Sequence, residues 1–192
     1  AKGSVAEEGY PWGIDTNLIA IGGASACVIT SLFVNHCDKP EEFRAFGQGS
    51  LDMIEDLGGF FSSSSIDYSG YSWEGSIVTI NIAGALHDAD WIEPGDTPII
   101  SVHGDQDEVV PYHSGDLGEQ AFGVVNLTLD GSWVLHTRAQ QVGVCSFLHN
   151  VTNDGHPSNN ASDAYFEYMF SYIIGRHKAL LDGRDFCSTD LG

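Results

Sequence analysis

Three short segments of the sequence each place a polar side chain of catalytic type after an apolar run. The segment "GGASAC" supplies Ser25, "HGDQDEVVP" supplies Asp105 or Asp107, and "HNVTNDGHP" supplies His149 or His156. A serine can attack an acyl carbonyl when a histidine removes its proton and a carboxylate orients that histidine. The chain order Ser, Asp, His is that of hydrolases whose serine lies on a sharp strand-to-helix turn. The sequence therefore predicts acyl transfer through a Ser-Asp-His triad.

The turn around Ser25 needs small neighbours, because the backbone at its apex is strained. Gly23, two residues before the serine, meets this need, whereas Cys27 stands two residues after it, where a second glycine is usual. We expect the Cys27 side chain to crowd the neighbouring strand. The alternative interpretation of Ser25 is a helix N-cap, whose hydroxyl accepts a hydrogen bond from the first helical turn. A strand-like run before the serine and a helix-length run after it favour the nucleophile.

Asp107 is preferred over Asp105 as the acid that orients the histidine. Asp105 directly follows the expected end of a strand, whereas Asp107 lies further into the loop, ahead of "VVP", where the chain turns back. We interpret Asp105 as a turn residue that stabilises the bend at Gly104.

His156 is the preferred base, because it lies in the loop between the last expected strand and the last expected helix. His149 stands at the end of that strand and remains the alternative, unless it is a half-buried strand residue. The other histidines are given no role: His113, His136 and His177 are expected at the surface, and His36, His87 and His103 precede the acid, which the chain order disfavours. The histidines and acids are not spaced as metal ligands, so no metal is expected.

Alternating strands and helices must position these groups. Strands are expected at 18–21, 77–82, 98–103 and 144–149, and helices at 26–35, 41–56, 132–142 and 162–181. Such alternation predicts an α/β fold with a parallel sheet, and apolar runs such as "PIISV" indicate helices on both faces. Sites in these folds lie beyond the carboxyl ends of the strands. We expect a single domain over residues 1–192, with 58–72 as a loop within it.

Composition and charge limit the classes of partner. The chain has 192 residues with 42% hydrophobic content, enough for one sizeable core. Its 27 acidic and 7 basic residues give a net charge of −20, so nucleic acid and anionic lipid are not expected partners. No apolar run approaches the roughly 20 residues of a membrane span. Glycosylation-type triplets at Asn126, Asn150 and Asn160, together with the acidity, favour a secreted glycoprotein.

The cysteines show no C-x-x-C spacing, which argues against a zinc ribbon or a thioredoxin-type site. In a parallel sheet, the start of the last strand and the end of the last helix fall at the same edge. Cys145 and Cys187 occupy these places, so we expect a disulfide between them, whereas Cys27 and Cys37 are expected to remain free.

Three longer segments resemble α/β-hydrolase family esterases and lipases, above all secreted bacterial carboxylesterase-like members. They are "GIDTNLIAIGGASAC", "NIAGALHDADWIEPGDTPIISVHGDQDEVVPY" and "DGSWVLHTRAQQVGVCSFLHNVTNDGHP", and the resemblance covers about residues 13–181. It implies a carboxylester hydrolase with Ser25 as nucleophile, His156 as general base and Asp107 as its orienter. The backbone N–H of Ala26 would be one oxyanion donor. No cofactor is implied, and the substrate would be a small-molecule or polymer-linked ester.

The resemblance covers only the central and carboxyl-terminal part of that family. Its members carry further strands ahead of the elbow strand, with a glycine-rich loop that donates the second oxyanion N–H. We therefore expect a fragment or a cut-down relative that lacks the N-terminal strands. Such a chain would need a complementary N-terminal segment, or would form a homo-oligomer through its bare strand edge. The alternative function is a non-catalytic hydrolase-derived module for binding or assembly in an extracellular structure.

Overall fold

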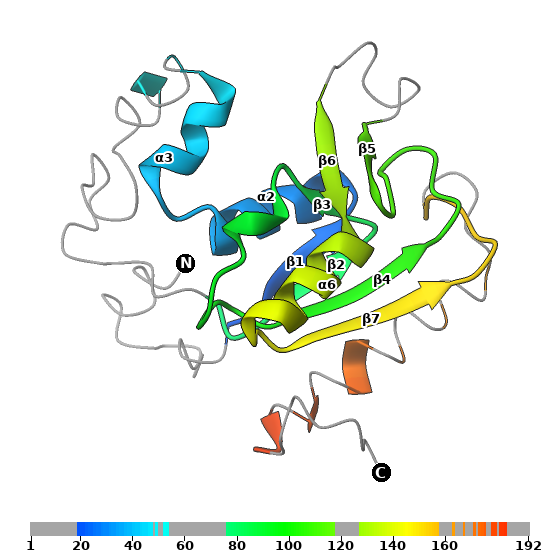
Figure 1. The fold of residues 1–192 in the computed structure, drawn as a ribbon. Coiled ribbons are helices and arrows are strands. Elements are labelled where there is room, and N and C mark those ends of the chain that lie inside the picture. The colour runs from blue at the N-terminus through cyan, green and yellow to red at the C-terminus, as the bar shows by residue number, and fades with distance from the viewer. Residues whose placement is uncertain are drawn as a thin grey trace.

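A computed structural model describes residues 19–47, 76–117 and 127–157, with isolated positions at 49, 52–53 and between 163 and 183. At its centre is a parallel sheet in the order β1-β2-β4-β7 (Figure 1). The strands are β1 (Ile21–Ala24), β2 (Thr79–Ile82), β4 (Ile99–Gly104) and β7 (Ser146–Val151). Parallel pairing brings their carboxyl ends to one edge of the sheet, and Ser25, Asp107 and His156 each follow one of these ends.

The first strand begins three residues later than 18–21, the range expected from the sequence. Ile21–Ala24 pairs in parallel with Thr79–Ile82, so the strand runs through both glycines up to the serine. Gly22 is needed there, because an added Cβ would lie 2.3 Å from the carbonyl oxygen of Ile80. Gly22 and Gly23, which suggest a turn in the sequence, are therefore part of β1, and Gly22 lies in close contact with β2.

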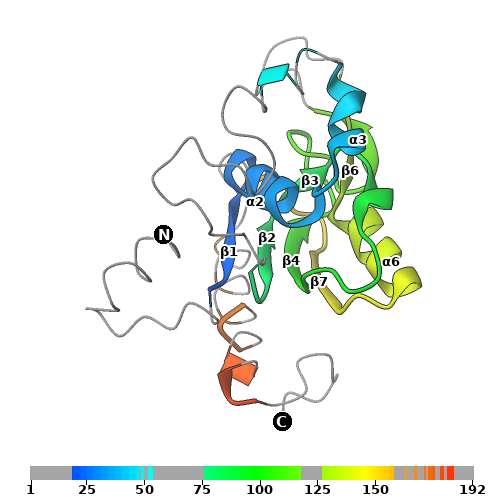
Figure 2. The same cartoon turned by 90° about the vertical axis from the view of Figure 1, so that its left-hand side faces the viewer.

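Helices cover both faces of the sheet, as expected (Figure 2). On one face, α2 (Ala26–His36) and α6 (Ser132–Val142) contribute Leu32 and Leu135 to a core that includes Ile99 of β4. On the other face, Ile100 and Phe147 pack against Ile173. Ile173 belongs to a run whose described positions from 163 to 181 are helical, within the helix expected at 162–181.

The helix expected at 41–56 is interrupted in the part of the range that the structure describes. Its first part is α3 (Pro40–Phe43), the 3-10 turn η1 (Arg44–Phe46) follows, and Gly47, with φ 90°, interrupts the helical run. Residues 52 and 53 are also helical. The rest of that range, and the loop expected at 58–72, lie outside the described residues.

A small antiparallel sheet that the sequence did not reveal lies beside the acid loop. It contains β3 (Ala85–Leu86), β6 (Thr128–Gly131) and β5 (Ser114–Asp116), in the order β3-β6-β5. The β6 strand leads directly into α6, and the backbone N–H of Trp133 donates to the Tyr112 carbonyl at 3.1 Å. Ala85 of β3 and Leu129 of β6 pack with Val109 and Val110 in one buried cluster, so these short strands support the loop that carries Asp107.

The α2/α6 face of β2 and β4 carries buried polar side chains beside Ile99, although the sequence suggested apolar strands throughout. Thr79 and Asn81 of β2 and Ser101 and His103 of β4 are all buried on this face. Asn81 donates to the Ser101 hydroxyl at 3.0 Å, so part of the sheet is joined to its neighbours by side-chain hydrogen bonds.

The structure tests part of the cysteine predictions. Cys27 and Cys37 are free thiols, as expected. Cys187 lies outside the described residues, so its pairing with Cys145 stays a prediction. In the part of the chain that the structure describes, no helix combines the length and apolar character needed to cross a bilayer.

Candidate active site

Ser25 lies at the apex of a strained turn between β1 and α2, with φ 57° and ψ −127°. A positive φ is uncommon for a residue other than glycine and is found at sites that the surroundings hold in place. Here the Ser25 N–H donates to the Ile82 carbonyl at 3.0 Å, and its carbonyl accepts from Val28 and Ile29 at 3.1 Å. The Ser25 side chain makes no capping hydrogen bond. The N-cap interpretation is therefore wrong, and the hydroxyl is available for chemistry.

Cys27 does not crowd the neighbouring strand, so this expectation was wrong. The cysteine is exposed, and the backbone that it approaches is that of Gly23. A Cβ added to Gly23 would lie 2.8 Å from the Cβ of Cys27. The glycine before the serine thus provides the space that the cysteine after it occupies.

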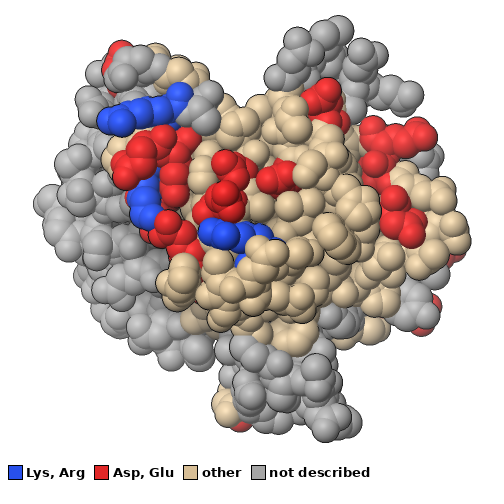
Figure 3. Space-filling model, in the orientation of Figure 1, with Lys and Arg blue, Asp and Glu red and all other residues tan. Residues whose placement is uncertain are grey.

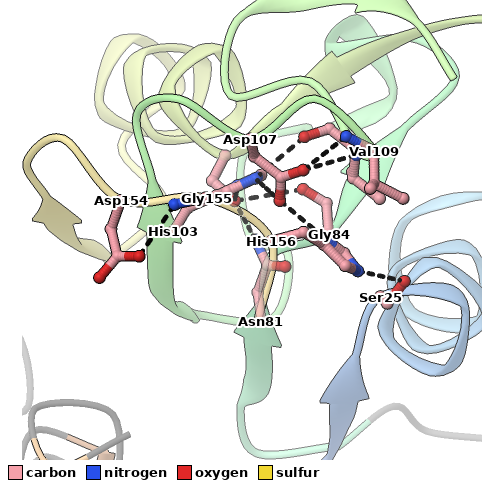
Figure 4. A network of polar contacts seen from close by, with 11 residues as sticks. Ser25, Asn81, Gly84, His103, Asp107, Val109, Asp154, Gly155 and His156 are labelled. Atoms are coloured by element: carbon pink, nitrogen blue, oxygen red, sulfur yellow. Dashed lines mark hydrogen bonds and ion pairs between the residues drawn. The ribbon is translucent and has the colours of Figure 1, made fainter. Parts of the chain in front are cut away.

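The structure brings Ser25, Asp107 and His156 together in one hydrogen-bonded line (Figure 4). The Ser25 Oγ lies 3.0 Å from Nε2 of His156, and Nδ1 of His156 lies 2.7 Å from Oδ2 of Asp107. The side chains of His156 and Asp107 are 2% and 0% exposed. With Nδ1–H donating to the carboxylate, Nε2 is left to accept the serine proton.

The Asp107 carboxylate is held on both oxygens. Oδ1 accepts from the backbone N–H groups of Val109 and Val110 at 2.8 and 2.9 Å, and Oδ2 accepts from His156 and His103. Burial raises the pKa of this carboxyl, but the hydrogen bonds from His103, His156 and the two backbone groups outweigh burial and hold it well below its usual range. The carboxylate is therefore ionised. Its contribution to stability is present above the unfolded pKa of 3.8 and is lost as the pH falls below that value.

The two alternatives in the sequence lie elsewhere. His149 is within β7, paired in register with Val102, and the histidine that contacts Ser25 is His156. The Asp105 carboxylate accepts from the backbone N–H of Asn153 at 2.7 Å. Asp105 therefore joins the acid loop to the histidine loop, which is a wider role than stabilising its own bend.

Two of the histidines that were expected at the surface are described. His113 is exposed, as expected, but His136 is half-buried, with Nδ1 3.0 Å from the Ser146 hydroxyl. Burial lowers the pKa of His136. His177 lies outside the described residues.

His103 is the site residue that the sequence interpretation missed. It is fully buried at the end of β4 and contacts Asp107, yet its place before the acid in the chain removed it from consideration. The available signal was its position four residues ahead of Asp107, directly before the bend at Gly104.

Ala26 is the first residue of α2 and is exposed beside Ser25. Backbone N–H groups in the first turn of a helix lack acceptors within the helix and are suited to a developing negative charge. Its role as an oxyanion donor stays a prediction. Among the described residues, no group of three or more histidine, cysteine, aspartate or glutamate side chains could hold a metal ion.

Gly104 fixes the distance between the acid loop and the histidine loop. An added Cβ would lie 2.3 Å from the Asp154 carbonyl oxygen and 2.7 Å from that of Gly155. Gly104→Ala must therefore displace the loop that carries His156. We expect the free energy of unfolding, measured with urea, to fall by about 1–3 kcal/mol.

Gly175→Ala is the matched control for this change, because an added Cβ there has no atom within 4 Å and the residue is helical. This control should leave stability unchanged or slightly raised. Equal stability of the Gly104→Ala protein and the parent would contradict the close approach of the two loops.

Solved esterases share this fold at low sequence identity. An esterase from the Planctomycetes species Thermogutta terrifontis superposes with a TM-score of 0.56 at 14% identity, over 95% of this chain and 61% of that protein. The carboxylesterase Cest-2923 from Lactobacillus plantarum gives a TM-score of 0.55 at 11% identity, over 98% of this chain and 66% of the enzyme. The T. terrifontis esterase 2 phosphorylated by paraoxon gives 0.57 at 14% identity, over 94% and 60%.

These likenesses show the fold. The chain has the α/β-hydrolase architecture of these esterases and spans about 60–66% of the length of the three. No protein-family model and no curated protein matches the sequence.

Proposed function

We propose that this chain is the catalytic part of a serine hydrolase that acts on carboxylic esters. The observation that carries the proposal is the contact of Ser25 Oγ with Nε2 of His156 at 3.0 Å, in a histidine whose Nδ1 lies 2.7 Å from Asp107. A strained backbone presents the serine, and no capping bond occupies its hydroxyl. These features combine an available nucleophile with an oriented base.

The reaction follows from the positions of these groups. The Ser25 oxygen attacks the ester carbonyl carbon while its proton passes to Nε2 of His156, and the Asp107 carboxylate stabilises the imidazolium. The proton then goes to the leaving alcohol as the ester C–O bond breaks, which leaves an acyl group on Ser25. A water deprotonated by His156 releases this acyl group as a carboxylic acid. Ala26 would supply one N–H for the oxyanion.

Covalent labelling tests the nucleophile directly. The paraoxon-phosphorylated T. terrifontis esterase shares this fold, and we expect a fluorophosphonate to add one group per molecule to Ser25. Intact mass measures the stoichiometry, and peptide mapping locates the adduct. Heat-denatured protein is the control, because an unfolded serine has no oriented base. An adduct on another residue, or equal labelling of denatured protein, would place the chemistry elsewhere.

The alternative of a non-catalytic module has lost part of its basis. It rested on a crowded Cys27 and on the lack of a second oxyanion loop, and Cys27 is exposed beside an intact turn. For the second oxyanion donor, we propose a complementary N-terminal segment or a second copy of the chain that pairs with β1. Within the described sheet β1 pairs with β2 alone, and strand edges recruit partners.

We place the protein outside the cell, where an acidic surface favours solubility. Figure 3 shows carboxylates at several places on one face, with basic side chains beside some of them. One such ion pair joins Arg138 to Asp90 at 3.3 Å. Asn150, which begins a glycosylation-type triplet, is exposed on β7. Asn126 and Asn160 lie outside the described residues.

A further inference from the structure

His103 is a second buried imidazole on the acid of the proposed triad. Its Nε2 lies 3.2 Å from Oδ2 of Asp107 and 3.2 Å from the carbonyl oxygen of Val110. Both of these neighbours only accept hydrogen bonds, so Nε2 carries a hydrogen. Oδ2 of Asp107 therefore receives two imidazole N–H groups, one from His103 and one from Nδ1 of His156 (Figure 4).

The other nitrogen of His103 is held by a buried hydroxyl. Nδ1 lies 2.7 Å from Oγ of Ser132, the first residue of α6, which is fully buried. The Ser132 hydroxyl also lies 3.2 Å from the Gly84 carbonyl oxygen, to which it donates when Nδ1 carries a hydrogen; it donates to Nδ1 when that nitrogen carries none. The Ser132 oxygen in turn accepts from Nδ2 of Asn81 at 3.0 Å. His103 is thus fixed at both ring nitrogens.

We propose that His103 is a positioning residue, which orients the Asp107 carboxylate and shares its charge with His156. The proposal rests on the function proposed above. His103 does not touch the serine. It acts through Asp107. When two N–H groups share one carboxylate oxygen, each interacts less strongly with the negative charge than a single donor would. Burial raises the pKa of Asp107, and the hydrogen bonds from His103 and His156 both lower it.

The direction of the expected pH effect follows from this sharing. Without the N–H of His103, the Asp107 charge acts on His156 alone and favours its protonated form, which cannot accept the serine proton. The acid limb of kcat/KM should then move to higher pH. The groups that face His103 are Asp107, Ser132 and Tyr112, whose ring centroid lies 5.5 Å away. Burial, followed by the Asp105 charge, raises the pKa of Tyr112, so the phenol stays neutral in this range.

Two substitutions separate the hydrogen bond from the volume of the ring. His103→Gln keeps an N–H donor near the position of Nε2, whereas His103→Leu removes it. We expect His103→Leu to lower kcat for a short-chain nitrophenyl ester by about 10- to 100-fold at nearly constant KM, with the acid limb shifted upward. His103→Gln should restore most of the parental kcat and most of the parental pH profile. His136→Gln is the control, because His136 bonds Ser146 outside this network and should change neither.

A readout without substrate separates this proposal from the proposed function. In protein labelled with ¹⁵N-histidine, we expect exchange-protected proton signals from Nε2–H of His103 and Nδ1–H of His156. His103→Leu should remove the first signal and shift the second. His103→Gln should also remove the first signal but leave the second near its position in the parent, because the amide N–H replaces the lost donor. If both signals are present but the protein hydrolyses no ester, the proposed function is refuted while the hydrogen bonds of His103 and His156 to Asp107 are supported. A folded His103→Leu with unchanged kcat, pH profile and His156 signal would overturn the proposal.

Discussion

Ser25→Ala is expected to lower kcat for a simple acyl ester by on the order of 10⁵- to 10⁶-fold. The change removes the only oxygen that lies within hydrogen-bonding distance of Nε2 of His156 among the described contacts. Any remaining rate would come from binding and oxyanion stabilisation alone. The backbone at position 25 stays non-glycine, so the turn and its strain are retained. The measurement is steady-state turnover of a nitrophenyl ester, together with loss of fluorophosphonate labelling.

Ser31→Ala is the matched control for Ser25→Ala. Ser31 lies on α2, the helix that follows Ser25, and its hydroxyl donates to the Cys27 carbonyl at 3.1 Å, away from His156. This variant should keep parental turnover and labelling. Turnover by Ser25→Ala within tenfold of the parent would assign the nucleophile to another residue.

His156→Ala should cost turnover nearly as much as Ser25→Ala, because the serine then lacks a group to take its proton. It also leaves the buried Asp107 carboxylate with one fewer donor, so some loss of stability should accompany the loss of activity. The comparison is with His149→Ala, which removes the other histidine considered in the sequence. We expect His149→Ala to change kcat by less than about tenfold, since the loss of a side chain outside the triad removes no proton acceptor.

Both variants should be compared across pH with urea unfolding as the folding check. A folded His149→Ala protein that loses turnover, beside an active His156→Ala protein, would reverse the two assignments.

The sequence predicted the parts of this molecule whose signals are local. Helix 132–142 was predicted with the bounds that the structure has, since it is one continuous amphipathic run. Ser25, Asp107 and His156 were chosen because each follows a strand, and parallel strands end at one edge. The direction of the Cys27 side chain was not readable in this way, because it depends on the turn geometry. Neither was the register of β1, which depends on how closely Gly22 can approach β2.

The buried network shows a different limit. Asn81, His103 and Ser132 lie in separate elements, and the sequence around Asn81 and Ser132 gives no sign of a site. Hydropathy treats "IVTINI" as an apolar strand, although its Thr79 and Asn81 face inward to polar partners. Only the packing of α6 against β2 and β4 brings these side chains into contact. The short strands β3, β5 and β6 were not predicted either, because a strand of two to four residues is too short to show an alternating pattern.

The backbone of Ser25 sets folding against function. A serine at φ 57° and ψ −127° raises the energy of the native state by on the order of 1–3 kcal/mol, whereas glycine could adopt this conformation with little strain. Natural variation that favoured stability alone would place glycine at position 25 and lose the hydroxyl. Under the proposed function, the hydroxyl is retained at the expense of thermal robustness. A screen for heat-tolerant variants of this chain should therefore also measure activity, because it would select inactive proteins that carry glycine at position 25.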